Sequence, residues 1–407
     1  MIEIVGDYMR IRLLYILSLL LLMGQGAWAT TVNVSTYAEL RAAIDDPSVN
    51  IIIVTADIDV PCETSVTNKS NPDYTGASTA QLVIGRSLTL QSQAGSRYTI
   101  KRVAADGATN GQLKSLFSIR GDGSGTSGTA NLSGNTVEVT FTNIIIDGGA
   151  VWGNSAVDDR RKADATAYGN AGRSMIDVFM GGTLNLEDGA ELQNGFTTYS
   201  INSVVNNTGS DNYGGAVRVE YDANYGGGTV NLKAGATIHD CSARGGDGDN
   251  INTHGYGGAL GAYNFANLNV YGGTIYNCSA ANGGAIGCTW RTGSTLSTAG
   301  KINLYGGTIH HCYANKGGAI ITEGEVEDYL LGGSISNCTA TTSGGAIAIT
   351  EKNTKVHIVD SGSEWLTISN CSPVVEGSEG TGGYPSVYGI TGSVLLLCCK
   401  PNNWFIF

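Results

Sequence analysis

One short segment of the sequence combines paired carboxylates with neighbouring cations. Asp158 and Asp159 are followed directly by Arg160, Arg161 and Lys162. Paired acids can hydrolyse a glycosidic bond, and acids beside a basic side chain can hold Ca²⁺ and support elimination on an acidic sugar. A charge run inside a long polar segment is more typical of a solvated loop, which is the interpretation we favour. The catalytic candidates, all weak, are Asp158, Asp159, Arg161 and Lys162.

A second segment carries oxygen ligands of the kind that Ca²⁺ prefers. Asp247 and Asp249 lie on either side of Gly248 and are followed by Asn250. Carboxylate and amide oxygens this close in sequence can share one calcium ion. Two acids in a glycine-rich loop also describe an ordinary turn. Asp247 and Asp249 are therefore weak metal candidates, and we expect the chain to hold no metal and no cofactor.

Five cysteines recur at intervals of roughly 26 to 37 residues, a spacing typical of a repeat protein. Equivalent residues of stacked parallel strands lie about 4.8 Å apart, but their Cβ atoms point alike rather than toward each other, which disfavours disulfides. Zinc is disfavoured because no Cys-x₂₋₄-Cys pair accompanies them, and Cys398-Cys399 lacks that spacing. We predict a buried packing ladder made of Cys241, Cys278, Cys312, Cys338 and Cys371.

The position before each cysteine is also repeated. It is Asn in most copies, with Asp240 and His311 as variants, and we expect these side chains to satisfy backbone groups at a corner. His239 and His310 fall on the segment just before it. The sequence shows no Ser-His-Asp arrangement and no phosphate-binding loop. We therefore interpret the histidines as polar variants of structural positions rather than as catalytic bases.

Two glycine signatures alternate with these cysteines, and their spacing predicts the fold. The clearest copy, residues 302–320, has three short segments of β character separated by a glycine pair or a polar corner. A helical repeat would instead need amphipathic stretches, and a propeller blade would need four antiparallel strands. We predict an all-β chain, a right-handed parallel β-helix with three strands per coil. Gly-Gly-Thr or Gly-Gly-Ser begins at Gly181, Gly227, Gly272, Gly306 and Gly332, and Gly-Gly-Ala begins at Gly214, Gly257, Gly283, Gly317 and Gly344.

The N-terminus, residues 1–29, predicts a cleaved secretory signal. Two arginines precede the apolar run Leu13–Met23, and an Ala-Trp-Ala cleavage sequence ends at residue 29. The apolar run is too short for a convincing membrane span. Shortly after it, Thr36 and Glu39 have the spacing of a capping box, which predicts a short helix that covers the first coil.

The mature chain, residues 30–394, is expected to be a single β-helix domain, because a solenoid grows by adding coils without a domain boundary. We expect irregular coils over 50–180, with long polar inserts that project as loops, and regular glycine repeats over 181–372. Residues 395–407 form an atypical apolar and aromatic tail. Because nothing polar covers the last coil, we expect a truncated or frameshifted end.

Composition limits the partners. The formal net charge is −12 and only 14% of the residues are charged. Nucleic acid is excluded, because binding phosphates requires clustered Lys and Arg. No segment of the mature chain predicts a transmembrane span. We expect a monomer whose partners are glycans or surface proteins.

The tetrapeptide Gly-Gly-Ala-Ile occurs at Gly283, Gly317 and Gly344, and it resembles the repeats of polymorphic outer-membrane proteins. The resemblance covers residues 181–372, although the Phe-x-x-Asn half of that family's motif is here Ile-x-Asn-Cys. The wider pattern resembles pectate-lyase-like β-helix proteins secreted by gut bacteria. These resemblances imply a β-helix with an adhesin-like role. The Asn-Thr-Asp, Gly-His-Gly and Arg-Ile-Lys motifs of polygalacturonase-like enzymes are absent from the sequence.

The sequence thus predicts a non-catalytic secreted or cell-surface β-helix protein of a bacterium, adhesin-like or glycan-binding, located outside the cell or at the outer membrane. The alternative is a polysaccharide lyase or glycoside hydrolase that acts on acidic polysaccharides. A third possibility is a structural spacer that binds nothing.

Overall fold

The computed structural model describes most of the chain after residue 28. Asp247, Asp249 and the predicted signal peptide, apart from Ala29, lie outside the described residues. The described ranges are 29–64, 80–108, 113–121, 137–162, 168–198, 212–222, 226–244, 254–263, 266–289, 300–324, 326–350, 355–358, 366–373, 387–389, 394–400 and 403–406.

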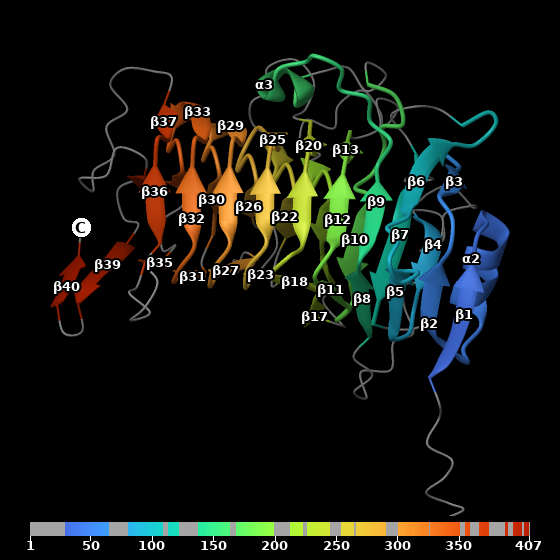
Figure 1. Cartoon of the computed structure of the whole chain (residues 1–407). Coiled ribbons are helices and arrows are strands. Elements are labelled where there is room, and N and C mark those ends of the chain that lie inside the picture. The colour runs from blue at the N-terminus through green and yellow to red at the C-terminus, as the bar shows by residue number, and fades with distance from the viewer. Residues whose placement is uncertain are drawn as a thin grey trace, which may run out of the picture.

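The chain is a parallel β-helix. Four sheets, named A to D, run along its length, and strands from successive coils lie side by side (Figure 1). Neighbouring strands within these sheets are parallel, except that β39 and β40 are antiparallel. The fold class predicted from the glycine repeats is therefore confirmed.

Sheets A, B and D are the three long sheets that the repeat predicts. Sheet A contains β1 (Thr30–Val34), β2 (Val49–Val54), β5 (Leu88–Ser92), β8 (Glu138–Thr142), β11 (Thr183–Leu186), β18 (Thr229–Leu232), β23 (Asn267–Val270), β27 (Lys301–Leu304), β31 (Glu327–Leu330), β35 (Lys355–Ile358), β39 (Val394–Lys400) and β40 (Asn403–Ile406). Sheet B contains β3 (Ile58–Cys62), β6 (Thr99–Ala104), β9 (Ile144–Asp147), β12 (Ala190–Gln193), β19 (Thr237–His239), β24 (Thr274–Tyr276), β28 (Thr308–His310), β32 (Ser334–Ser336) and β36 (Thr367–Ser369). Sheet D contains β4 (Ala80–Ile84), β7 (Ser115–Arg120), β10 (Ile176–Phe179), β15 (Val217–Val219), β22 (Leu260–Tyr263), β26 (Ile286–Thr289), β30 (Ile320–Thr322), β34 (Ile347–Ile349) and β38 (Val387–Gly389).

Sheet C is a fourth, short sheet, so the coils from β13 onward have one more strand than predicted. Its strands follow the cysteine of each coil, or Gly195 in the coil that contains β13, where the sequence indicated only a polar corner. The corner is long enough for its backbone N–H and C=O groups to pair with the next coil, which satisfies them. Sheet C contains β13 (Phe196–Thr197), β20 (Ser242–Ala243), β25 (Ser279–Ala280), β29 (Tyr313–Lys316), β33 (Thr339–Ser343) and β37 (Ser372–Pro373). Two further pairs lie beside the sheets: β14 (Asn212–Tyr213) with β21 (Gly255–Tyr256), and β16 (Tyr221–Asp222) with β17 (Gly226–Gly227).

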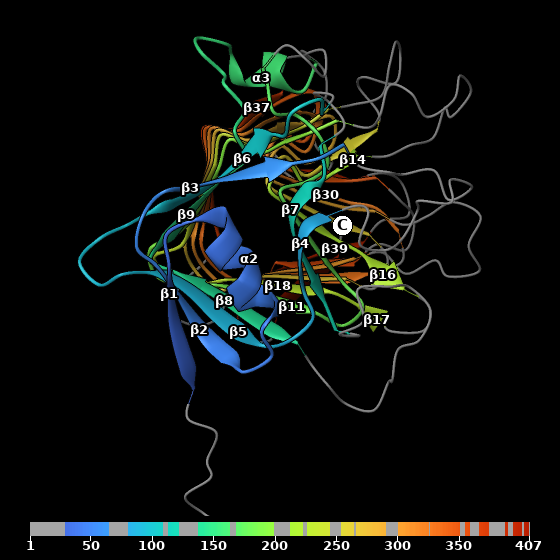
Figure 2. The same ribbon diagram turned by 90° about the vertical axis from the view of Figure 1, so that its right-hand side faces the viewer.

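The predicted capping helix is present as α2, Tyr37–Asp45. The Thr36 side chain accepts the N–H of Glu39, and the Glu39 carboxylate accepts the N–H of Thr36, so both halves of the capping box form. Leu40, among other residues, is buried against the first coil. Seen along the stack, α2 lies across the opening of the coils (Figure 2). The sequence analysis missed β1, which precedes the helix and pairs with β2.

The core is a set of columns that run along the helix axis. In sheet A, alternate residues such as Val230 and Leu232 are wholly buried, while the residues between them face outward. The predicted cysteine ladder also lines this core. Its five thiols are free and buried, and each Sγ donates to the carbonyl two residues earlier, at 3.1 Å for Cys241 and 3.4 Å for Cys312.

The Gly-Gly-Ala corner brings the backbones of adjacent coils into contact. The first glycine of each pair has a left-handed backbone, with φ of 63° at Gly317. A Cβ on the second, Gly318, would lie 2.1 Å from the carbonyl oxygen of Gly345 in the next coil. No side chain fits there, which explains why this glycine recurs.

The position before each cysteine has a conformational role. Its residues have φ near 50°, as in Asp240 (50°), Asn277 (52°) and His311 (53°). Asn and Asp tolerate this left-handed backbone better than other residues with a side chain. The expectation that these side chains satisfy corner backbone groups was wrong for Asp240 and His311, whose hydrogen bonds are to other side chains.

Candidate functional site

The charged segment around Asp158 folds onto the body of the β-helix. It contains the short helix α3 (Val157–Arg160), which lies above the strands of sheet C (Figure 1). Arg160 and Arg161 are only 7% and 1% exposed, so the interpretation as a solvated loop does not hold for these two arginines, whereas Asp159 and Lys162 are exposed. The Asp158 carboxylate pairs with Arg161 at 2.8 Å and also with Lys162. Three of the four catalytic candidates are therefore bound to one another in ion pairs, and these pairs do not include Asp159.

Arg160, which was not a candidate, holds this segment in place. Its guanidinium donates to Asp240 Oδ1 at 2.7 Å and to the carbonyl of Asn277 at 3.2 Å. It also lies over the ring of Trp152, 5.1 Å from the ring centroid. Trp152 donates to the carbonyl of Asp240 at 2.7 Å and packs edge-on against Phe196. Asp240 and Asn277, which precede the cysteines and have a left-handed backbone, thus bind the segment because they expose a carboxylate and backbone carbonyls.

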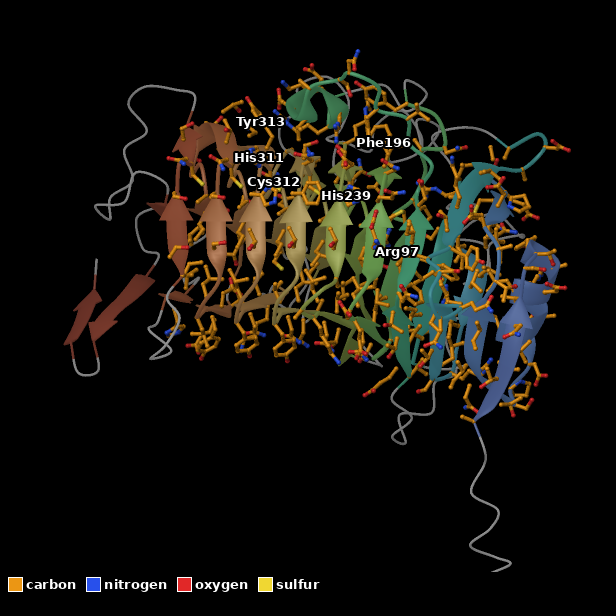
Figure 3. The ribbon with its side chains drawn as sticks, viewed as in Figure 1. Arg97, Phe196, His239, His311, Cys312 and Tyr313 are labelled. Atoms are coloured by element: carbon orange, nitrogen blue, oxygen red, sulfur yellow. The ribbon has the colours of Figure 1, made fainter. Side chains whose placement is uncertain are left out.

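A histidine-centred ion network continues from Asp240 across sheet B. His239 Nδ1 lies 2.7 Å from Asp240 Oδ2, and its Nε2 lies 3.0 Å from Glu191 Oε1. Glu191 also pairs with Arg97, and Figure 3 shows Arg97 and His239 on the same side of the molecule. Burial lowers the pKa of His239, but the hydrogen bonds to Asp240 and Glu191 outweigh it and raise that pKa to about 9. His239 is therefore a cation at neutral pH and cannot act as a general base.

The carboxylates of this network are equally unsuited to acid catalysis. The hydrogen bond from His239 lowers the pKa of Glu191. Burial raises the pKa of Asp240, but hydrogen bonds from His239 and Arg160 outweigh it, and the net shift is downward. A glycosidase acid needs a raised pKa so that it carries a proton near neutral pH. The network therefore provides charge and rigidity rather than proton transfer.

An aromatic column extends along sheet B from His239. Its ring stacks on Tyr276 with centroids 4.7 Å apart, and Tyr276 stacks on His310 at 5.2 Å. The three residues are register partners on β19, β24 and β28. The structure thus places His239 and His310 at one ladder position, as the sequence analysis proposed. His311 lies at the next position and contacts His310 edge-on.

The outer face of sheet A carries a ladder of asparagines that the sequence analysis missed. Asn231 donates its amide N–H to Asn185, Asn269 to Asn231, and Asn303 to Asn269, each at 2.8 Å. An amide has two N–H donors and two acceptor lone pairs. Each inner amide, Asn231 and Asn269, uses one donor and one acceptor in the ladder and is partly exposed, whereas Asn185 and Asn303 are only 8% and 7% exposed. The signal was present in the sequence as Asn-Leu or Asn-Val at the end of four successive sheet A strands.

A pair of exposed tyrosines borders this ladder. Tyr271 and Tyr305 follow the last residues of β23 and β27 and stack with centroids 4.9 Å apart. They are 51% and 41% exposed, unusually high for rings of this size. On the same face, Tyr329 stacks on His357 at 4.7 Å, and the ammonium group of Lys301 lies over the Tyr329 ring. Side-chain amides beside accessible aromatic rings are suited to recognising polar ligands with apolar faces.

Sheet D carries a charged cluster of its own. Asp177 is 2% exposed and accepts the Ser115 hydroxyl at 2.7 Å and Arg173 Nε at 3.5 Å. Arg218, its register partner on β15, pairs with Glu220. These charges offset one another along the face, as they do in the His239 network.

The metal predictions remain without support. Asp247 and Asp249 lie outside the described residues, and the part of the chain that is described contains no group of three or more His, Cys, Asp or Glu side chains placed to hold a metal ion. Within that same part, no helix is long and apolar enough to cross a membrane.

The N-terminal coils match a known family. Residues 31–176 match the family described as a pectate lyase-like adhesive domain. The match covers α2 and the irregular coils, less than half of the 407 residues, and ends before the glycine repeats. No curated protein and no solved structure matches the chain. The matched family thus supports an adhesin-like function for the chain.

Proposed function

We propose that this chain is an adhesin-like β-helix that binds glycans through the outer face of sheet A. The asparagine ladder beside the exposed pair Tyr271–Tyr305 carries the proposal. Sugars present hydroxyl groups that hydrogen-bond to amides, and their C–H faces pack on aromatic rings. The adhesive family matched by residues 31–176 supports the same role.

The setting of this role is part of the proposal. Residues 1–29 have the pattern of a secretory signal, and an adhesin must reach the cell surface or the medium. We place residues 30–394 in one β-helix domain, because the strands of sheet A continue in sequence order from β1 to β39. The Gly-Gly-Ala-Ile resemblance to polymorphic outer-membrane protein repeats stays a prediction in favour of the same role.

The enzyme alternative has less support from the geometry. The Asp158 carboxylate is held by two cations, and the pKa values of Glu191 and Asp240 are shifted downward. Asp328 is an acid with a raised pKa, but it is 1% exposed in the interior, where no polysaccharide can reach it. The charged segment is better explained as structural, because Arg160 fixes it to Asp240 and to the carbonyl of Asn277.

A glycan array tests the binding role. The mature chain should bind one class of glycan, and the double variant Tyr271→Ala/Tyr305→Ala should lose at least tenfold in affinity. The matched control is Val151→Ala, which shortens an exposed apolar residue away from sheet A. Equal binding by the double variant would remove sheet A as the site, and a chain that binds no glycan would favour the spacer.

A polyuronide panel tests the enzyme. We expect no new reducing ends and no unsaturated products from the mature chain. Products that disappear in the double variant Asp158→Asn/Asp159→Asn would overturn the non-catalytic proposal.

A further inference from the structure

Two histidines converge on the surface of the coil that contains β28. The Nδ1 atoms of His310 and His311 lie 2.7 Å apart, and their rings are nearly perpendicular, at 87°. The His311 side chain is exposed and that of His310 is half-buried. The pair lies outside the family match, and the proposed glycan face on sheet A does not use it.

The backbone explains why consecutive residues point the same way. Successive side chains of a strand face opposite sides, so His311 would normally face the interior. Its left-handed backbone, with φ of 53°, breaks this alternation, and the next residue, Cys312, is the one buried in the core at 1% exposure. His310 is held by stacking on Tyr276. The two imidazoles are therefore pre-positioned by the corner that recurs in every coil.

The chemistry of the pair is that of a metal chelate. Only one proton fits between two imidazole nitrogens, and neutral imidazole is a good ligand for late first-row metals. The two Nδ1 atoms are hydrogen-bonded at 2.7 Å, so a bound metal ion takes the place of the shared proton and holds the two imidazoles in adjacent positions. Adjacent nitrogen ligands suit square-planar or octahedral coordination, and the affinity of such sites for late first-row ions peaks at Cu²⁺.

We propose that His310 and His311 form a surface site for a divalent late first-row metal ion, which binds Cu²⁺ and Ni²⁺ more tightly than Zn²⁺. Water completes the coordination, since the described residues supply no group of three ligands. The site is a two-ligand chelate whose affinity depends on both rings. It stands independently of the proposed glycan binding.

The coils themselves supply suitable variants. In the neighbouring coils, Asn277 and Asn337 occupy the position equivalent to His311, both with φ of 52°. The variant His311→Asn therefore preserves the backbone conformation of the corner. The position of His310 is Ser336 in the next coil, which makes His310→Ser compatible with the strand. His239→Gln is the matched control. It removes a histidine of the same column whose two ring nitrogens are already bonded to carboxylates, and Gln193 occupies that position one coil earlier.

Ni²⁺ is the probe, because it does not oxidise thiols. Isothermal titration of the untagged mature chain at neutral pH should show one Ni²⁺ ion bound per chain, with Zn²⁺ bound at least threefold more weakly. His311→Asn and His310→Ser should each weaken Ni²⁺ binding at least tenfold, whereas His239→Gln should change it less than twofold. Unchanged affinity in either test variant, or no binding of Ni²⁺ at millimolar concentration, would overturn the proposal. Tighter binding of Zn²⁺ than of Ni²⁺ would contradict the proposed coordination geometry of the site.

Discussion

The stability of this chain should depend on pH through an acid in the interior of the β-helix. Asp328 on β31 is 1% exposed and lies in an inward column beside Val356. Its Oδ1 accepts the N–H of Ile302 at 2.8 Å. Burial outweighs the hydrogen bonds from Ile302 and Thr322 and raises the pKa of Asp328 to about 7.

The size of the effect follows from the two protonation states. The ordinary pKa of this carboxyl is 3.8, so between pH about 4 and about 7 the folded protein holds a proton that the unfolded chain has lost. The stability that this proton contributes is complete at low pH and is lost as the pH rises through that window. At about 1.4 kcal/mol for each pH unit, the loss amounts to about 4 kcal/mol.

The substitution Asp328→Asn removes the titration at nearly constant volume. We expect the free energy of unfolding of Asp328→Asn minus that of the wild type to grow by about 4 kcal/mol between pH about 4 and about 8. Urea unfolding, followed by tryptophan fluorescence, measures it. The control Glu327→Gln changes the neighbouring exposed acid and should leave the pH dependence as it is. A difference between Asp328→Asn and the wild type that does not vary with pH would refute the reasoning.

Two further predictions concern the corners and the thiols. Gly318→Ala should destabilise the chain by at least about 3 kcal/mol in urea unfolding, because the new Cβ meets backbone of the next coil. Gly95→Ala, which has a left-handed backbone but open space around it, should cost only about 1–2 kcal/mol, and equal losses would contradict the steric argument. In the double variant Cys398→Ser/Cys399→Ser, the seven remaining cysteines are the buried free thiols of the structure, so a thiol reagent should label fewer than one per native chain and seven after denaturation. Rapid labelling of the native chain, or a mass two hydrogens lower for each disulfide, would contradict this.

The repeat itself was predictable from the sequence because its constraints are local. Glycine pairs, β-branched segments and a recurrent cysteine each reflect the backbone or the packing at one position. Because every coil has the same positions, these residue types recur along the sequence and can be recognised as a repeat. The capping box at Thr36 and Glu39 is local in the same way, and it formed as predicted. The fourth strand of each coil was missed because β25 and its equivalents form only by pairing with the adjacent coils. A strand of two residues is too short to show an alternating pattern in the sequence.

The site was harder to predict because it depends on contacts between distant segments. Nothing near Arg160 in the sequence indicates that it binds Asp240 and the carbonyl of Asn277. Charge runs are usually solvated, but Arg160 in this one is buried because a left-handed corner offers it acceptors. The outward asparagines of sheet A were visible as a repeated letter, but their amide-to-amide chain requires the register of β11, β18, β23 and β27.

The corners of the glycine repeats also determine how such a rod changes over evolutionary time. The Gly-Gly-Ala corners that begin at Gly214, Gly257, Gly283 and Gly317 each meet the next such corner through the same backbone contact, so a coil that starts at one corner can join the chain at another. An in-frame duplication from one Gly-Gly-Ala to the next would therefore insert a compatible module and lengthen the rod by about 4.8 Å. Recombination between repeats can adjust the reach of the protein and the number of binding positions along sheet A in single steps, without any need to redesign the core.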